Sequence, residues 1–378
     1  MDQFFATCPR GLEAVLAQEL AALGAAQVSA TDGGVRFSGP LALCYRVNLE
    51  SRVASRVLWQ IDSASYRLEE DVYRHARSLP WERWFTPHQT IAVKVTAQRC
   101  PLKSLDFITL RIKDAICDFF RDSTGIRPSV DTRMPEVRIH AYFDAQQFTL
   151  YLDTSGEALF KRGYREFTGE APLRENLAAG ILKLSGWEPG MALFDPMCGS
   201  GTFVLEAALM ALKIAPGLKR SFGFERLKNF EPKIWDQLRA EAAAQPLTTN
   251  ALPIQGSDSD KWAVMDARKN LDNAGLQGVA RLEEKDILDI VAPAASGVLV
   301  MNPPYGERIG EADELAELYP KLGSVLKQGF AGWKVGILTA DLRLPKLMRL
   351  KPARKIPLFN GPIECRLYLF EMVAGSNR

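Results

Sequence analysis

The sequence contains little that would build a metal site, a disulfide framework or a membrane span. Its three histidines are scattered, so no metal site is expected. Its six cysteines lie far apart without a CxxC pair, which predicts reduced thiols. No apolar run approaches the length of a transmembrane helix, and the start, MDQFFATCPRGLE, lacks a basic leader before an apolar stretch. We therefore expect a cytoplasmic protein without membrane contact.

Charge alone does not identify a partner. The 378 residues carry a formal net charge of only +2, so a nucleic-acid binder needs a local basic face. Residues 343–355 hold six basic residues and no acid, and Lys161, Arg162 and Arg165 form a second cluster. Charge by itself favours a solvated surface at both clusters. The length and the 47% hydrophobic content predict a globular chain of two or three domains.

The pattern of predicted elements changes twice along the chain. Residues 1–64 follow a strand–helix–strand–helix–strand order, which is typical of a ferredoxin-like unit. Residues 65–168 repeat an α+β pattern in a larger form and end in two alternating strands joined at residues 144–146. Residues 169–378 alternate short apolar strands with helices, which predicts a mostly parallel sheet. Two strands around the turn NGP predict an antiparallel hairpin at its edge.

The stretch MALFDPMCGSGTFVLEAALMAL predicts a glycine-rich loop between a strand and a helix. Its Asp-x-x-x-Gly-x-Gly spacing resembles the S-adenosylmethionine (SAM) loop of class I methyltransferases. Glycines permit positive φ and let a ligand lie against bare backbone, and open α/β sheets bind ligands at the carboxyl ends of their strands. A dinucleotide fingerprint requires a glycine where Val204 stands, and a P-loop requires a lysine after the glycines. The candidate cofactor-binding residues of this loop are Asp195, Pro196, Cys198, Gly199, Gly201 and Thr202.

Two more predicted strands end in acids that suit the same site. The strand in LPIQGSDSD ends at Asp258, which is placed to bind ribose hydroxyls, and ARLEEKD ends at Asp286, which is placed to accept from an adenine amine. A lone aspartate after a strand is usually a turn residue or an N-cap. The cofactor roles of Asp258 and Asp286 therefore depend on their position in the series of strands that starts with the glycine-rich loop. The segment between Gly201 and Asp258 exceeds the ~20 residues of a minimal nucleotide unit. We therefore predict an inserted helical segment there.

The most specific signal is SGVLVMNPPYGER, in which a buried strand at residues 298–301 is followed by Asn302, Pro303, Pro304 and Tyr305. This matches the (D/N)PP(Y/F) motif of amino-methyltransferases. An exocyclic base amine is a poor nucleophile because its lone pair is delocalised into the ring. The Asn302 side-chain oxygen and the Pro303 carbonyl can accept both amine hydrogens, and the prolines hold these acceptors in place. Tyr305 can stack on an extruded base, and the loop has no cysteine for carbon methylation.

Taken together, DPMCGSGTFVLEAA, GSDSD, MNPPYGER and FNGPIECRLYLF resemble the bacterial 23S rRNA guanine-N2 methyltransferases of the large-subunit methyltransferase L type, also called UPF-type RNA methylases. KSLDFITLRIKDAI and SGEALFKRGYR resemble a THUMP domain that follows a ferredoxin-like domain. The resemblance covers essentially the whole chain. It implies an α/β class I methyltransferase domain, Rossmann-like with a mostly parallel seven-stranded sheet and an antiparallel end hairpin. It also implies that the cofactor is SAM and that the product is N2-methylguanosine. The implied partner is RNA, either rRNA or a ribosomal precursor.

The resemblance further implies site residues outside these motifs. Pro172 and Leu173 would lie near the cofactor and Asn360 near the terminal hairpin, although a helix start and a hairpin turn explain them equally well. The implied phosphate contacts are Lys103, Lys161, Arg162 and Arg165. Some relatives are fused to a second methyltransferase, but only one activity is expected of this chain.

Three other functions remain open. A tRNA guanine-N2 methyltransferase shares the THUMP half and the NPPY loop, whereas DNA adenine-N6 and protein glutamine-N5 methyltransferases share only the loop. A non-catalytic RNA-binding or ribosome-assembly factor is the alternative from another class. The motif residues that are intact argue against it: Asp195, Gly199, Gly201, Asn302 and Tyr305. The sequence predicts neither the target nucleotide nor the oligomeric state.

Overall fold

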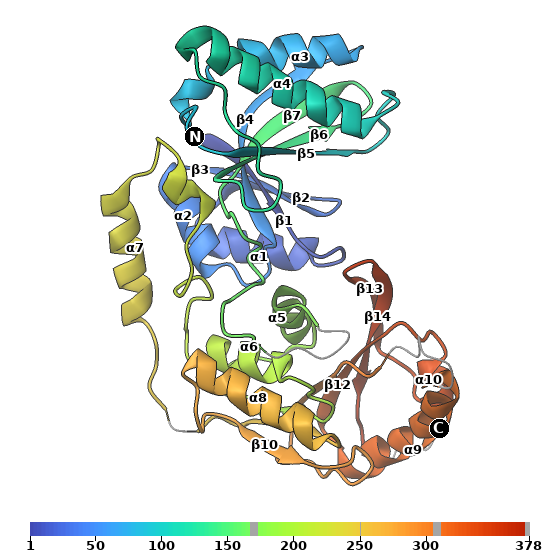
Figure 1. The fold of residues 1–378 in the computed structure, drawn as a ribbon. Coiled ribbons are helices and arrows are strands. Elements are labelled where there is room, and N and C mark those ends of the chain that lie inside the picture. The colour runs from blue at the N-terminus through green and yellow to red at the C-terminus, as the bar shows by residue number, and fades with distance from the viewer. Residues whose placement is uncertain (167–172, 250, 305–310, 375–378) are drawn as a thin grey trace.

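The computed structural model describes residues 1–166, 173–249, 251–304 and 311–374. Within these ranges the strands form two seven-stranded sheets, each at the centre of one lobe (Figure 1). The first lobe contains the N-terminal part of the chain, and the second contains most of the residues that follow residue 173. Tyr305 and Pro172 lie outside the described residues, as does the predicted boundary at residues 168 and 169.

The first sheet joins the two predicted N-terminal units into one structure. Its strand order is β2-β3-β1-β4-β7-β6-β5. The strands are β1 (Asp2–Thr7), β2 (Ala26–Thr31), β3 (Gly34–Gly39), β4 (Arg56–Ser65), β5 (Ile91–Ala97), β6 (Val137–Phe143) and β7 (Gln147–Asp153). The long strand β4 pairs antiparallel with β1 on one side and with β7 on the other. The sequence predicted both α+β units, but it did not predict the sheet that they share through β4.

Helices cover this sheet. They are α1 (Glu13–Ala22), α2 (Leu41–Glu50), α3 (Glu69–Ser78), the short η1 (Trp81–Arg83) and α4 (Leu105–Thr124). Helix α4 begins where the Ser104 hydroxyl accepts a hydrogen bond from the Phe107 amide at 3.1 Å, and it ends at Gly125 with a φ of 75°. The apolar residues that recur at helical spacing along α4 are all buried: Ile108, Ile112, Ile116 and Phe120.

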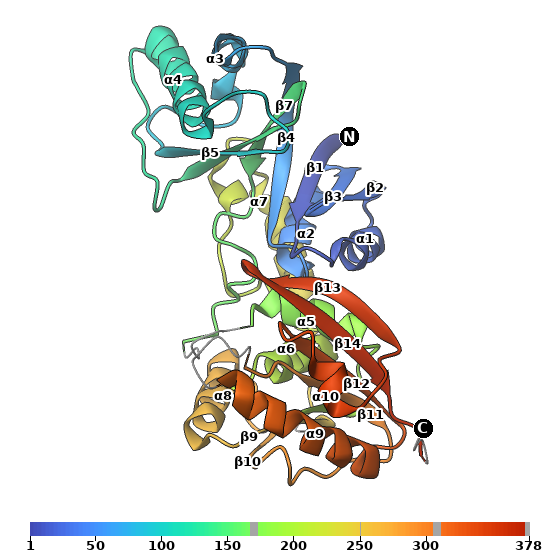
Figure 2. The ribbon, with the colours of Figure 1, turned by 90° about the vertical axis from the view of Figure 1, so that its right-hand side faces the viewer.

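The second sheet confirms the predicted class I arrangement. Its order is β10-β9-β8-β11-β12-β14-β13, in which the first five strands are parallel and β14 pairs antiparallel with both β12 and β13. The strands are β8 (Leu193–Asp195), β9 (Ile254–Asp258), β10 (Arg281–Glu284), β11 (Gly297–Met301), β12 (Trp333–Thr339), β13 (Arg354–Asn360) and β14 (Ile363–Glu371). The predicted hairpin is β13–β14, which Figure 2 shows in front of the second lobe, and β13 is the edge strand.

Both faces of the second sheet are buried, which explains why β11 is apolar at every position. Val298 and Val300 belong to one hydrophobic core, while Leu299 and Met301 belong to the other. The first core includes residues of α5 (Glu175–Leu184), α6 (Thr202–Ala211) and α8 (Lys261–Ala274). The second includes residues of α9 (Glu311–Gly329) and α10 (Leu344–Met348). Helices therefore cover both faces of the sheet.

The predicted insertion lies between α6 and β9 and packs against the first lobe. It contains the short η2 (Gly223–Arg226) and α7 (Pro232–Ala244), which stands beside α2 in Figure 1. The Tyr45 ring lies 4.4 Å from the Phe224 ring, and the Tyr45 hydroxyl donates to the Asn229 carbonyl at 3.3 Å. The Arg220 guanidinium donates to carbonyls of residues 155–161. These contacts hold the two lobes in one arrangement.

Candidate active site

The predicted site residues meet at one edge of the second sheet. Asp195 is the last residue of β8 and Asp258 the last of β9, while Asn302 directly follows β11. Asp286 follows the end of β10 by two residues. Because β10, β9, β8 and β11 are consecutive and parallel, their carboxyl ends lie together. The sequence-based prediction of a shared edge is confirmed.

The glycine loop is shaped by two left-handed backbone positions. Gly199 has a φ of 50° and Gly201 a φ of 85°. A Cβ atom on Gly199 would meet no atom within 4 Å, whereas one on Gly201 would lie 3.0 Å from the Ala267 Cβ. Gly199 therefore leaves its side of the loop open to a ligand, and Gly201 lets α6 pack against α8. The Asp258 carboxylate accepts a hydrogen bond from the Gly199 amide at 2.9 Å. The end of β9 is therefore linked directly to the loop that follows β8.

The acids of the loop suit a cationic ligand. Asp195 is 1% exposed, and its carboxylate accepts from the Met197 amide at 3.3 Å. Burial raises the pKa of the Asp195 carboxyl well above its usual value, and the charge of Asp258 raises it further. Among the described residues, no basic side chain forms an ion pair with either acid. SAM carries a sulfonium and an ammonium group together with a ribose diol, so the residues present fit this cofactor.

The remaining loop residues support the backbone of the site. Pro196 and Cys198 are buried, and burial raises the pKa of the Cys198 thiol well above its usual value, which keeps the thiol neutral. Thr202 begins α6 and is 7% exposed. Leu173 is buried, and Asn360, also buried, is the last residue of β13. The cofactor contacts of these residues stay predictions.

The acceptors predicted for the base amine follow a rigid strand. Val298, Leu299, Val300 and Met301 are all buried, after which Asn302 is half-buried, Pro303 buried and Pro304 exposed. This gradient places the Asn-Pro-Pro segment at the transition from core to surface. Asp286 is exposed, and one of its carboxylate oxygens accepts from the Leu288 amide at 2.8 Å. The stacking role of Tyr305 and the adenine contact of Asp286 stay predictions.

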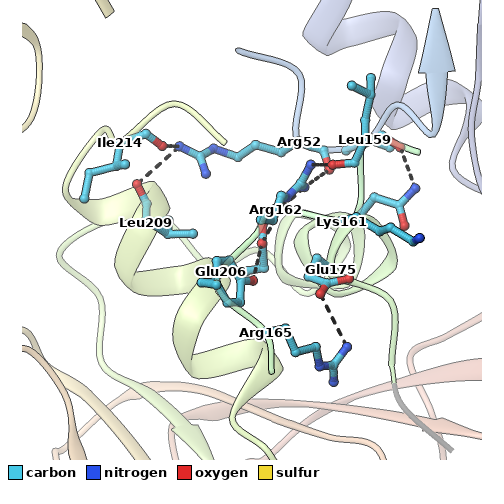
Figure 3. Close-up of polar contacts among 12 residues, drawn as sticks. Arg52, Leu159, Lys161, Arg162, Arg165, Glu175, Glu206, Leu209 and Ile214 are labelled. Carbon is cyan, nitrogen blue, oxygen red and sulfur yellow. Dashed lines mark hydrogen bonds and ion pairs between the residues drawn. The ribbon is translucent and has the colours of Figure 1, made fainter. Parts of the chain in front are cut away.

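Two of the predicted RNA contacts are wrong. Arg162 is 3% exposed, and its Nε donates to Glu206 Oε1 at 3.3 Å, so it faces the junction of the lobes and not solvent (Figure 3). The Arg165 side chain is 11% exposed, and its Nη2 donates to Thr202 Oγ1 at 2.6 Å in the glycine loop. Lys161 and Lys103 are exposed, and Lys161 pairs with Glu157 at 2.9 Å. One signal was available in the sequence: Glu206 interrupts the apolar helix TFVLEAALMA and requires a buried partner.

The fold and the site together define a class I methyltransferase, the class that transfers a methyl group from SAM. Residues 162–368 match the family model described as "RMKL-like, methyltransferase domain", which covers more than half of the chain. Residues 3–58 match the "RlmL ferredoxin-like domain" and residues 66–153 the "THUMP domain". The chain therefore belongs to the RMKL-like methyltransferase family.

Similar proteins cover the whole chain. A protein of Synechocystis named "Putative RNA methyltransferase slr0064" is 40% identical over 98% of this chain and 96% of its own length. "Ribosomal RNA large subunit methyltransferase K/L" of Shewanella sp. is 40% identical over 100% of this chain. The alignment includes 54% of the Shewanella protein, so this chain spans about half the length of such relatives. The solved structure of SMU.472, "a putative methyltransferase complexed with SAH", is 32% identical with a TM-score of 0.89 and covers 98% of both chains.

Neither a metal site nor a membrane segment is evident in the described ranges. Among those residues, no cluster of histidine, cysteine, aspartate and glutamate could hold a metal ion. In the same part of the chain, each helix is too short or too polar to cross a bilayer.

Proposed function

We propose that this protein methylates N2 of a guanine in the 23S RNA of the large ribosomal subunit. The observation that carries the proposal is the position of Asn302-Pro303-Pro304 directly after β11, whose neighbour β8 ends in Asp195 of the cofactor loop. The THUMP match and the large-subunit names of its relatives favour RNA over DNA or protein as the substrate. The place of action is then the cytoplasm, where ribosomal RNA is made in bacteria.

Some residues of the chain bind the cofactor, and others bind the target base. SAM, when bound, supplies the electrophilic methyl group. Asp258 binds the ribose hydroxyls, Asp195 faces the cofactor's positive charge, and Asp286 accepts from the adenine amine. The Asn302 side-chain oxygen and the Pro303 carbonyl accept the two hydrogens of the guanine amine, which directs the nitrogen lone pair at the methyl group. Tyr305 stacks on the extruded base.

The experiment that tests this function is mass spectrometry of nucleosides from ribosomal and transfer RNA of a deletion strain. Loss of N2-methylguanosine from one 23S fragment, restored by the wild-type gene, supports the proposal. Loss from transfer RNA alone favours the tRNA enzyme instead. No change in either pool, together with no heat on titration of the purified protein with SAM, favours the non-catalytic binding factor.

SAM binding is expected to strengthen as the pH rises through the pKa of Asp195 in the free protein. Burial raises the pKa of this carboxyl, so the free protein holds a proton there at a pH where an ordinary aspartate does not. A cationic ligand favours the carboxylate, so binding lowers the pKa and releases the proton. Between the two pKa values the Kd therefore falls, by up to about tenfold per pH unit. Titration calorimetry in buffers of different ionisation enthalpy measures the released proton.

The matched variant for this measurement is Asp195→Asn. It cannot titrate, so its Kd for SAM is weaker and changes little over the same pH range. An equal pH dependence in the variant and the wild type would show that another group carries the proton.

Lys103 is the exposed member of the predicted RNA contacts that has no ion pair among the described side chains. We expect Lys103→Glu to weaken binding to a 23S fragment and to lower the slope of log K against log salt by about 0.7–0.9 per lost phosphate contact. Fluorescence anisotropy over a salt series measures both effects. Lys321→Glu, an exposed change of the same charge on α9, is the control. An unchanged slope in the Lys103 variant would mean that this lysine is a solvated surface residue that does not contact phosphate.

A further inference from the structure

Residues 162–166 form a strap that crosses α6 and α8 beside the glycine loop. The Tyr164 hydroxyl donates to Glu206 Oε1 on α6 at 2.8 Å, and the Glu166 amide donates to Asn270 Oδ1 on α8 at 3.3 Å. Asn270 in turn donates to the Ser200 carbonyl at 3.1 Å, within the loop itself. Asn270 is fully buried, while Ser200 is half-buried. The strap is thus connected to both helices that follow the cofactor strands.

Arg165 is the residue of the strap that reaches the loop directly. Its Nη2 donates to Thr202 Oγ1 at 2.6 Å and to Ser200 Oγ at 3.1 Å. Its Nη1 donates to the Leu173 carbonyl at 2.8 Å and lies 3.5 Å from Glu175 Oε1. Figure 3 shows Arg165 below Glu175, with a dashed line that joins the two side chains. One guanidinium therefore links the loop to the start of α5.

The chemistry of these contacts requires arginine. The guanidinium presents donors in a planar fork, so its two Nη atoms can serve separate acceptors at the same time. A lysine carries a single ammonium group and cannot hold Leu173 and the two hydroxyls in the same geometry. Ser200 stands between the two glycines of the loop, where the backbone has the fewest restraints of its own.

The strap is also anchored on the side of the first lobe. Arg162 Nη2 donates to the Arg52 carbonyl and its Nη1 to the Leu159 carbonyl, both at 2.6 Å. Arg52 in turn donates to the Ile214 carbonyl at 2.6 Å, which follows α6. Arg165 therefore extends from a segment that is held on both sides of the lobe junction.

We propose that Arg165 is a positioning residue for the cofactor loop: it holds Ser200 and Thr202, and with them the Gly199–Gly201 backbone, in the conformation that binds SAM. This inference rests on the proposed function only in that the loop binds SAM, and it does not depend on which RNA is methylated. It replaces the phosphate-contact role that the sequence suggested for Arg165.

Arg165→Met is expected to raise the Kd and KM for SAM about tenfold, while kcat at saturating SAM stays within about threefold and the affinity for RNA is unchanged. Arg165→Lys restores part of the SAM affinity. Lys321→Met, a change at an exposed lysine of α9, is the control and leaves the Kd for SAM unchanged. The measurements are calorimetric titration with SAM and initial rates at varied SAM, after thermal melting has established that each variant is folded.

A double-mutant cycle with Ser200→Ala separates positioning from general support of the fold. If Arg165 acts through this hydroxyl, the two losses of SAM affinity are less than additive. A change below twofold in Arg165→Met, or full additivity with Ser200→Ala, overturns the proposal. If Arg165→Met does not fold, the same comparison uses Arg165→Lys, and an unchanged KM for SAM in both Arg165→Lys and Ser200→Ala overturns it. Absence of SAM binding in the wild type would instead contradict the proposed function.

Discussion

Replacement of Asn302 by alanine is expected to lower kcat by about 10²–10³-fold, while the Kd for SAM changes less than about threefold. Under the proposed function, the Asn302 oxygen acts on the base amine and not on the cofactor. Asn302 follows β11, whereas Asp195 and Asp258 end β8 and β9. The acceptor gains strength as the amine acquires positive charge, so its loss affects the transition state more than substrate binding. Single-turnover methylation of a 23S fragment at saturating SAM measures the effect.

Two controls make this result specific. Asn302→Asp keeps an acceptor at the same place and belongs to the (D/N)PP(Y/F) pattern, so it is expected to retain more activity than alanine. Pro304→Ala, at the exposed end of the segment, changes backbone stiffness without removing an acceptor and is expected to have a smaller effect. Loss of SAM binding in Asn302→Ala would falsify the assignment, because it would place this residue in the cofactor site.

The edge on which the site lies could be predicted because it depends on local patterns. Asp195 and Asp258 each end a short strand and Asn302 follows another, and parallel strands bring their carboxyl ends together whatever the length of the connections. The insertion before β9 therefore did not disturb the prediction. The positive φ of Gly199 and Gly201 agrees with the sequence-based prediction of a glycine-rich turn, because glycine permits this conformation.

What could not be predicted depends on contacts between distant segments. The pairing of β4 with β7 joins Leu58 to Asp153, and no local pattern indicates that two α+β units share a strand. The role of Arg162 depends on Glu206, which is 44 residues away. A basic cluster near the linker looks the same in sequence whether it faces RNA or a buried acid. Burial and pairing, not composition, distinguish the two cases.

Arg162→Met is expected to lower the free energy of unfolding by about 3–5 kcal/mol, because it leaves the Glu206 carboxylate buried without its cation. Glu206 is fully buried, and Tyr164 is its other partner, with a hydroxyl 2.8 Å from Oε1. Burial opposes the charge of Arg162, but the attraction of Glu206 outweighs it and raises the pKa of the guanidinium above its usual value. The same change removes the bonds to the Arg52 and Leu159 carbonyls. Urea denaturation followed by circular dichroism measures the loss.

The companion variant is the double change Arg162→Met with Glu206→Gln, which removes both charges. Its stability is expected to lie well above that of Arg162→Met, since no uncompensated charge then remains in the junction. Glu206→Gln alone leaves the Arg162 cation with carbonyl acceptors at 2.6 Å from two of its nitrogens, so its cost should be smaller than that of Arg162→Met. A loss below about 1 kcal/mol in Arg162→Met, in the range of exposed ion pairs, would mean that the junction opens and hydrates Glu206. In that case the strap would not be held from the side of the first lobe. Arg165, which contacts the loop at Ser200 and Thr202, would then depend on Leu173 and Glu175 for its own position.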